Sequence, residues 1–348
     1  MRRIAKVVNV GNIKIGGNEK ISIQSMLNAP SYDVEGNVEQ ALKLKKVGCD
    51  IIRVAIPDIE SVNLILKIKE KVDVPLVADI HFDYRLALES IEAGVDKIRI
   101  NPGNIGDEDK IKAVVKACKL KNVPIRIGVN SGSLEKEILK KYEHPTAQAL
   151  CESALYHASL LEKFDFGDIV LSMKSSDVKT MVDAYTIVAE RCSYPLHLGV
   201  TETGTQKLGV VKSAVGIGSL LLKGIGDTFR VSLTGNVEDE VECGKNILRS
   251  CGLYKGGIEI ISCPTCGRTR IDIIDLVNRA EKELSKFDKN LKVAIMGCAV
   301  NGPGEAREAD LGIAGGDGCG ILFKKGKVLR KVKETDLLDE LIFEIEKL

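Results

Sequence analysis

The sequence predicts an α/β fold in which a (β/α)8 TIM barrel, residues 1–255, is followed by a small α+β domain, residues 256–348. Two observations support this prediction. Eight short β-rich runs alternate with helical patterns over roughly 230 residues, which matches a closed eight-stranded barrel in number and in size. After a Gly-Gly linker in YKGGIE, residues 254–259, the pattern changes to several strands flanked by helices.

The barrel strands are predicted where apolar, β-branched runs end in polar clusters. They occupy residues 21–27, 50–56, 75–82, 97–104, 124–132, 168–176, 195–204 and 227–235. The alternating stretch before them, AKVVNVGNIKIGG, contains Gly-Asn and Gly-Gly turn signals and is predicted to form a capping hairpin. A doubly wound open sheet is the alternative fold. It would need fewer strands and a switch point, and no GxGxxG follows the first strand.

The C-terminal domain is predicted to run strand, helix, four strands and helix. The strands are IEIIS, KVAIMG, DLGIAGG, CGILFKKG and KVLRKV, and the helices are IDIIDLVNRAEKELSKF and TDLLDELIFEIEKL. A domain of about 90 residues buries only a modest core, so a bound metal centre would add to its stability.

Composition excludes several classes of function. The 348 residues carry a formal net charge of +1 and contain no tryptophan, so the chain has neither a basic field for nucleic acid nor a stacking platform for bases. No secretory signal is visible, and the most apolar stretch, SAVGIGSLLLKGIG, is broken by Lys223 and too short to span a bilayer. We therefore expect a cytoplasmic protein with reduced thiols and with no nucleic-acid or membrane partner.

Polar side chains recur late in the predicted barrel strands, where barrel enzymes place their sites. Residues two apart on a strand share a face, as Arg99 and Asn101 do, and in a barrel that face points inward. The polar residues singled out in this way are Arg53, Asp79, His81, Arg99, Asn101, Arg126, Asn130, Ser172, Lys174, Arg230 and Ser232. Cations outnumber the carboxylates of Asp79 and Glu202, which predicts a phosphate or diphosphate substrate. An internal ion-pair network is the structural alternative.

Lys174 also supports a rival enzyme hypothesis. A lysine at the end of the sixth strand lies where barrel aldolases form a Schiff base. That hypothesis would make the C-terminal domain a structural zinc domain.

Three cysteines of the C-terminal domain follow short strands on glycine-rich turns. ISCPTCGRTR supplies Cys263 and Cys266, and MGCAVNGPGEA supplies Cys298. A lone CxxC also occurs in zinc sites and redox disulfides, but a structural zinc site usually has four Cys or His ligands. Cys319, in a separate hairpin-like segment, is the remaining candidate for a fourth. The spacing favours an iron–sulfur cluster with an oxygen ligand, and a zinc-stabilised docking module is the alternative.

Other cysteines and histidines are interpreted as structural. Free cysteines in or beside helical patterns are typically small buried hydrophobes. This interpretation applies to Cys49, Cys118, Cys151, Cys192 and Cys243. His144 and His157 lie in loop and helix patterns and are given no role in the site.

Several separated motifs agree in order with one known family. QSM, DIHF, RINPGN, RIGVNSGSL, LSMKSS and GVTETG, followed by ISCPTCGR and MGCAVNGPGEA, closely resemble the bacterial 4-hydroxy-3-methylbut-2-enyl diphosphate synthase family in its two-domain form. The resemblance implies an iron–sulfur oxidoreductase of the methylerythritol phosphate route to isoprenoids. Its reaction would be the reductive dehydroxylation and ring opening of 2-C-methyl-D-erythritol 2,4-cyclodiphosphate to 4-hydroxy-3-methylbut-2-enyl diphosphate.

The resemblance also implies a cofactor, partners and roles for individual residues. A 4Fe–4S cluster would be held by Cys263, Cys266, Cys298 and Glu305, with Glu305 on the unique iron and Asn301 close to it. Electrons would arrive singly from ferredoxin or flavodoxin, and Glu202 would be the active-site acid. The implied substrate-binding residues are Arg53, Asp79, His81, Arg99, Asn101, Arg126, Asn130, Ser172, Lys174, Thr201, Arg230 and Ser232. A head-to-tail homodimer would close each barrel mouth with the partner's cluster domain.

Overall fold

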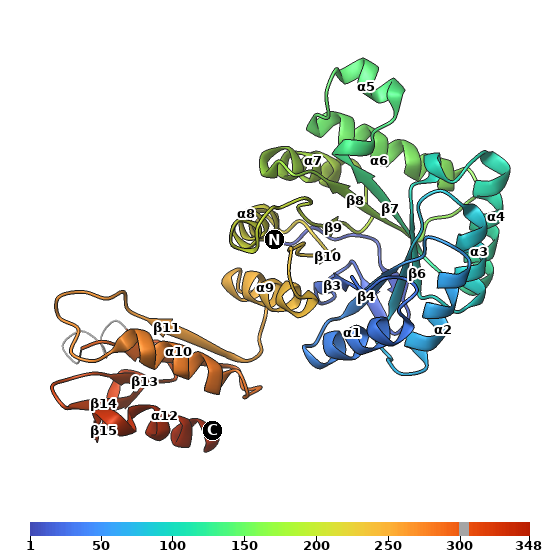
Figure 1. Cartoon of the computed structure of the whole chain (residues 1–348). Helices are drawn as coiled ribbons and strands as arrows, with labels where there is room; N and C mark the ends of the chain where they lie inside the picture. Colours follow the sequence, from blue (N-terminus) through green and yellow to red (C-terminus); the bar gives the residue numbers. More distant parts are fainter. Residues whose placement is uncertain (299–305) are drawn as a thin grey trace. The chain divides into compact units, whose positions relative to one another are not determined.

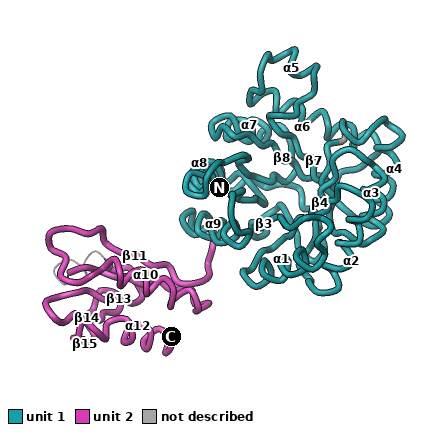
Figure 2. Tube along the Cα trace, viewed as in Figure 1, with its two compact units in different colours: residues 1–253 teal, residues 254–348 magenta. Residues whose placement is uncertain are grey.

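The chain folds as two units, Met1–Leu253 and Tyr254–Leu348, and the structure, a computed structural model, describes residues 1–298 and 306–348 (Figure 2). The second unit begins beside the Gly-Gly pair of the linker, where Gly257 has a φ of 68°. Glycine adopts that left-handed conformation without a steric cost. No helix within the described residues is long and apolar enough to cross a membrane.

An eight-stranded sheet forms the centre of the first unit (Figure 1). In sheet order its strands are β8 Ile169–Lys174, β7 Ile125–Asn130, β6 Lys97–Ile100, β5 Leu76–Asp79, β4 Ile51–Ala55, β3 Ser22–Met26, β10 Thr228–Phe229 and β9 His197–Leu198. Every neighbouring pair is parallel, and a further bridge joins Leu171 of β8 to Leu196 beside β9. That bridge brings the two ends of the sheet together, so the predicted (β/α)8 barrel is confirmed.

The two runs predicted at 195–204 and 227–235 form much shorter strands than expected. In each run only two residues form ladder pairs, and these are the strands β9 and β10. Beyond them the runs stay joined by isolated bonds, such as the one from Arg230 N–H to Leu198 O at 3.1 Å. The part of each run that follows its strand is therefore loop at the barrel mouth.

Helices follow the barrel strands and surround them on the outside (Figure 1). They are α1 Val34–Lys46, α2 Asn63–Lys69, α3 Tyr84–Glu92, α4 Glu108–Lys121, α5 Lys136–Tyr142, α6 Ala147–Glu162, α7 Val178–Arg191, α8 Gln206–Leu222 and α9 Val237–Ser250. Short 3-10 turns lie at Glu60–Val62, Pro102–Asn104 and Ser131–Ser133. Several helices begin at an aspartate that accepts a backbone N–H of the first turn, as Asp107 and Asp177 do.

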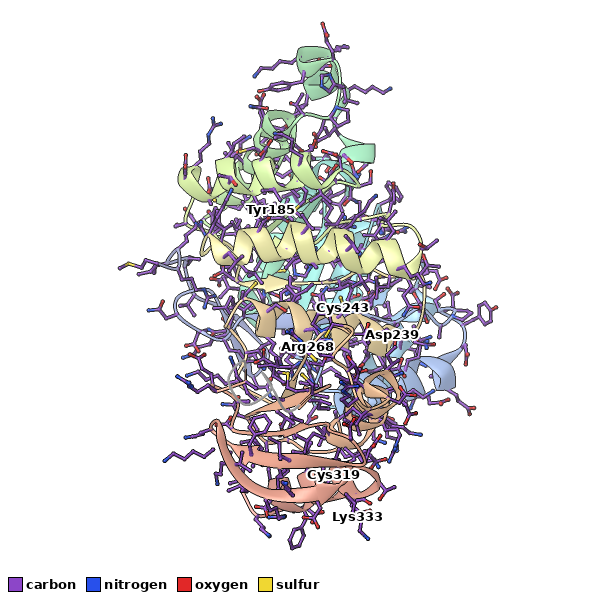
Figure 3. All side chains as sticks on the ribbon, turned by 90° about the vertical axis from the view of Figure 1, so that its left-hand side faces the viewer. Tyr185, Asp239, Cys243, Arg268, Cys319 and Lys333 are labelled. Atoms are coloured by element: carbon purple, nitrogen blue, oxygen red, sulfur yellow. The ribbon has the colours of Figure 1, made fainter. Side chains whose placement is uncertain are left out.

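Tyr185 ties α7 to the barrel strands (Figure 3). Its hydroxyl accepts a hydrogen bond from Met173 N–H at 3.0 Å and donates one to the carbonyl of His197. The side chain is completely buried. One phenol thus bridges β8 and β9, the pair of strands at which the barrel closes.

The antiparallel pair β1 Val8–Val10 and β2 Ile13–Ile15 precedes the barrel, as predicted for the capping hairpin. Val10 and Ile15 are buried together with Ile51 and Val77 of the barrel strands. Both barrel residues lie in the first half of their strands, so the hairpin covers the amino end of the barrel.

Alternation along the barrel strands separates an apolar outer face from a polar inner face. Residues such as Ile98 and Ile127 are completely buried on the helix side. The strand register places Asp79 opposite Arg99, and Arg99 opposite Arg126, on the inner side. Charged side chains from adjacent strands therefore meet inside the barrel.

A five-stranded sheet forms the second unit. Its order is β11 Ile258–Ser262, β12 Leu291–Met296, β13 Leu311–Ala314, β14 Cys319–Lys324 and β15 Lys327–Lys333. The first three strands are parallel and the last two are antiparallel to their neighbours. A 3-10 turn, Glu334–Asp336, precedes α12, Leu337–Glu346, which packs with α10, Ile273–Leu284, on a core that includes Val293 and Leu322. The predicted strands and helices of this unit are all present.

Candidate active site

Asp79, at the end of β5, is the centre of a charged cluster in the barrel. Its Oδ2 accepts a hydrogen bond from Arg53 Nη2 at 2.6 Å and lies 3.1 Å from His81 Nε2, while Oδ1 accepts one from Arg99 Nη1 at 3.2 Å. Burial acts to raise the pKa of Asp79, but the Arg53 charge, the His81 hydrogen bond and the Arg99 charge hold that pKa well below its ordinary value. One carboxylate therefore serves two guanidinium groups, which leaves an excess of positive charge.

Arg126 and Lys174 have no carboxylate partner among residues 1–298 and 306–348. Arg126 is 1% exposed and donates from Nη1 to Ser172 Oγ at 2.8 Å, and Lys174 is 7% exposed. Burial, followed by the charges of Arg230 and Arg126, holds the pKa of Lys174 well below its ordinary value. A buried cation without a counter-ion is costly, so this pair is prepared for an anion that arrives from outside.

Arg230 is paired within the chain through a residue that the sequence analysis missed. Its Nε and Nη2 donate to the two oxygens of Glu240 at 2.9 and 2.8 Å. Glu240, on α9, also accepts from Ser25 Oγ at 2.8 Å. A signal was available, because Glu240 shares the inner helix face with Val237, Val241 and Gly244 at helical spacing. The ion-pair alternative thus applies to Arg53, Arg99 and Arg230 but not to Arg126 and Lys174.

Two glycines on the inner face make room for long cationic side chains. A Cβ added at Gly128 would lie 2.1 Å from Arg99 Nε, and one at Gly199 would lie 2.9 Å from Lys174 Nζ. Arg99 also donates from Nη2 to the carbonyl of Gly128 at 3.1 Å. Cationic side chains therefore cross the barrel directly over these backbones.

The remaining predicted substrate-binding residues lie at strand ends or in the loops that follow. Asn101 is buried, and its side chain accepts from Gly103 N–H at 3.2 Å to begin a 3-10 turn. Asn130 ends β7 in register with Lys174. His81 has a side chain that is 54% exposed, beside Asp79. Thr201 donates its N–H to Ser175 O at 3.2 Å, and Ser232 accepts at its carbonyl from Thr203 Oγ1 at 2.6 Å.

Glu202 stands in an unusual backbone conformation. It has a φ of 50°, in the left-handed region that a residue with a long side chain rarely adopts, and its side chain is exposed. Such strain persists where the surrounding structure enforces it, and it is concentrated at functional sites. Glu143 has a similar φ of 64°, so the role of Glu202 in the site stays a prediction.

His157, to which we assigned no role, connects the turns that follow β6 and β7. The ring is completely buried, and its Nε2 contacts Glu135 Oε1. A Cβ added at Gly103 would lie 2.6 Å from the His157 ring. Glu135 and Gly103 belong to the loops that carry Asn130 and Asn101, so His157 holds two mouth loops together.

The cysteine motifs leave neighbouring strands at one edge of the second sheet. Ser262, at the end of β11, is in register with Ile295 of β12, so Cys263 and Cys298 follow the same ends of adjacent parallel strands. Cys263 Sγ accepts a hydrogen bond from Gly297 N–H at 3.2 Å. Cys266 is exposed, and hydrogen bonds led by the Arg268 backbone N–H lower the pKa of its thiol. Thiols with these properties fit a soft metal or an iron–sulfur cluster.

The remaining predicted metal ligand and its neighbour cannot be placed beside these three cysteines. Asn301 and Glu305 lie outside the described residues. Within the parts of the chain that are described, no three His, Cys, Asp or Glu side chains are gathered as a formed metal site. Cys319 is exposed at the start of β14, in register with Lys333 of β15 (Figure 3). The metal ligands therefore remain a proposal.

Comparison with known proteins identifies the family. The model described as the GcpE TIM-barrel domain matches residues 5–245, and the GcpE protein C-terminal domain matches residues 259–347. The chain belongs to the GcpE family. This GcpE chain is 59% identical over 345 residues to a relative from Clostridium perfringens and 60% identical over 341 residues to one from Fusobacterium nucleatum. These alignments cover 99% of both chains in the first case, and 98% of this chain and 96% of the relative in the second.

Both relatives are named 4-hydroxy-3-methylbut-2-en-1-yl diphosphate synthase (flavodoxin), so the family predicted from the sequence motifs is confirmed. The GcpE barrel is also similar to a crystal structure of type I 3-dehydroquinate dehydratase from Clostridium difficile. That match has a TM-score of 0.54 and 15% identity, and it covers 72% of this chain and 99% of the other. At this identity the likeness concerns the fold alone.

Proposed function

We propose that this GcpE protein is an oxidoreductase of isoprenoid biosynthesis. It converts 2-C-methyl-D-erythritol 2,4-cyclodiphosphate reductively to 4-hydroxy-3-methylbut-2-enyl diphosphate with flavodoxin as electron donor; the relatives' names give this product and flavodoxin. The observation that carries the proposal is the pair Arg126 and Lys174, buried cations without a carboxylate partner in the described chain. The reduced thiols and the soluble electron donor agree with a cytoplasmic location.

The barrel cations would hold the diphosphate. Its oxygens would supply acceptors for the unpartnered Arg126 nitrogens and for Lys174, which has no carboxylate partner among the described residues. Arg53 and Arg99 are already oriented by Asp79, so little rotamer freedom would be lost when their remaining N–H groups turn to a phosphate oxygen. Asn101, Asn130, Ser172, Thr201, Ser232 and His81 complete the proposed contact set. This arrangement would fix the anionic end of the substrate inside the barrel.

Cys263, Cys266 and Cys298 would hold a 4Fe–4S cluster, with Glu305 as the proposed oxygen ligand and Asn301 beside it. When bound, such a cluster supplies single electrons and a Lewis-acidic iron. The chain tunes this site through its own hydrogen bonds, since the Gly297 N–H to Cys263 Sγ stabilises negative charge on that sulfur. The lowered pKa of Cys266 favours the thiolate that a metal requires.

Glu202 would provide the proton of the reaction. The bond from the ring carbon to the phosphate oxygen breaks, the C3 hydroxyl leaves as water, and a carbon–carbon double bond forms. With the diphosphates ionised, two electrons and one proton are consumed for each substrate. A carboxylic acid held at the mouth suits delivery of that proton to the leaving hydroxyl.

The proposal is tested by the metal content of the full chain, purified without oxygen. Iron, acid-labile sulfide and zinc are measured, and product formation is then followed with reduced flavodoxin. About four irons and four sulfides per chain, with a brown colour lost in air, are expected for one cluster. Zinc near one per chain without sulfide, persisting after anaerobic reconstitution, would overturn the cluster and favour the aldolase alternative. In that case borohydride trapping at Lys174 becomes the next experiment.

We further propose that the active site is shared in a head-to-tail homodimer, in which each barrel mouth is completed by the second unit of the partner chain. Mixing a Cys298→Ser chain with a Glu202→Gln chain tests this sharing. Half of randomly mixed dimers are heterodimers with one intact site, so about a quarter of wild-type activity is expected. Absence of recovered activity, in a sample where differently tagged chains co-purify, would contradict the shared site.

A further inference from the structure

A second polar cluster lies inside the barrel, deeper than the charged cluster around Asp79. Lys97 precedes Arg99 by two residues on β6, and Gln24 precedes Met26 by two on β3, so each lies on the inner face one step toward the amino end. His197, on β9, likewise precedes Gly199, over which Lys174 passes. Two residues of a strand advance about 6.6 Å, so these side chains form a separate lower layer.

The side chains of this layer are buried and lack partners. Lys97, Gln24 and His197 have no exposed surface, and Arg126, in register with Arg99 on the neighbouring strand, is 1% exposed. Lys97 Nζ, both amide atoms of Gln24, His197 Nε2, and Arg126 Nε and Nη2 have no hydrogen-bond partner among the described residues. Buried polar atoms are nearly always paired, so these atoms need partners other than the described residues.

The chemistry of these atoms indicates what that occupant is. The ammonium of Lys97 and the two free nitrogens of Arg126 are donors only, and the one obligate acceptor is Gln24 Oε1. Water offers as many donors as acceptors, whereas an anion offers acceptors alone. No carboxylate among the described residues pairs with Lys97 or Arg126. Donor excess and unbalanced positive charge both favour an anion.

The electrostatics of the layer agree with this geometry. Burial, followed by the charges of Arg126 and Arg53, holds the pKa of Lys97 well below its ordinary value. The pKa of His197 is also held well below its ordinary value, first by burial and then by the charges of Arg126, Lys174 and Lys97. These groups are therefore close enough to repel one another, and a negative charge among them would relieve the repulsion.

We propose that the barrel interior holds a small inorganic anion of halide size on Lys97 and Arg126, with Gln24 and His197 completing its surroundings. The complete burial of Lys97 favours a free ion over a phosphate that enters from the mouth. The ion would balance the charge beneath the substrate site and stabilise the folded barrel. The proposed site shares Arg126 with the proposed diphosphate contacts and otherwise rests on Lys97, Gln24 and His197.

Bromide is the probe, used with the full-length, anaerobically purified chain at constant ionic strength against acetate. The thermal midpoint of the wild type should rise saturably by a few degrees as bromide replaces acetate. Lys97→Met keeps the length of the side chain and removes the donors, and it should abolish the rise. Lys116→Met, on the exposed face of α4, removes the same charge and should leave the rise intact. An equal bromide response in Lys97→Met would overturn the proposal.

A crystal of the wild type soaked in bromide gives a second test that needs no variant. An anomalous peak within hydrogen-bonding reach of Lys97 Nζ and Arg126 is expected. Water alone at this position would overturn the proposal. Adding pyrophosphate separates the two sources of an anion: bromide that stays beneath bound pyrophosphate supports a separate site. Bromide replaced by a pyrophosphate oxygen on Lys97 would assign the layer to the substrate and overturn an independent ion.

Discussion

A chain carrying Glu202→Gln is expected to keep the proposed 4Fe–4S cluster and its affinity for substrate while losing about 10²- to 10⁴-fold in turnover. The amide has the size of the carboxyl group and tolerates the same backbone at φ 50°, but it holds no proton to donate. The loss should fall on kcat, with KM little changed. Steady-state kinetics with reduced flavodoxin, together with iron analysis of the variant, measure both quantities.

Glu143→Gln is a matched control for that experiment. Glu143 is also an exposed glutamate in the left-handed region, with a φ of 64°, and it lies in the loop after α5 without an assigned role. Turnover equal to the wild type is expected for this variant. Unchanged turnover in Glu202→Gln itself would remove Glu202 from the mechanism and leave its backbone conformation as a feature of the loop.

Replacement of Asp79 by asparagine is expected to lower the free energy of unfolding of the ligand-free chain by about 3–5 kcal/mol. Asp79 is 2% exposed and is the carboxylate between Arg53 and Arg99, so the variant leaves the buried guanidinium of Arg99 and the partly buried one of Arg53 without their counter-ion. Saturating pyrophosphate should recover part of the loss, because its oxygens provide a new counter-charge. Urea unfolding with and without pyrophosphate measures both effects.

The same variant should change the dependence of stability on pH. The folded-state pKa of Asp79 lies well below the ordinary value of 3.8. Its ionised form therefore contributes stability that is complete above that ordinary value and is lost as pH falls through the folded pKa. Asp79→Asn should lack this part of the acid destabilisation. Asp73→Asn, which removes an exposed partner of Lys45, should show no resolvable change in stability. A change in Asp79→Asn as small as this control would refute the central role of Asp79.

The fold was largely predictable because each element has a strong local pattern. In the eight barrel runs and in the strands of the second unit, apolar and polar residues alternate, and turn residues mark the ends of each run. In the helices, the apolar residues repeat at helical spacing. The lengths of β9 and β10 were not predictable, because their runs remain β-rich where the ladder has ended. Strand propensity continues into the loops, and only the geometry of barrel closure ends the pairing.

The positive charge of the candidate site could be predicted from the sequence, but the ion-pair partner of each cation could not. Alternation identified the inward cations, but it gives no information on which carboxylate each one meets. Ser25 and Glu240 are 215 positions apart and still form a hydrogen bond. Lys97 shares the face of Arg99 at a spacing of two, so the same alternation also predicts it on the inner face. The strained backbone of Glu202 had no signal in the sequence, because glutamate does not favour that conformation.

The unequal exposure of the thiols determines where oxidative damage begins. Burial raises the pKa of Cys49, Cys118 and Cys243 in the barrel, whereas Cys266 is exposed and its pKa is lowered. Oxidants react with accessible thiolates, so in a chain without the proposed cluster they should attack the cysteine motif first and spare the barrel. The oxidised protein would then keep a folded barrel, while the thiols of its cysteine motif would be unable to bind a metal. Reduction of these thiols and renewed binding of the proposed cluster would then restore the protein without new synthesis of the chain.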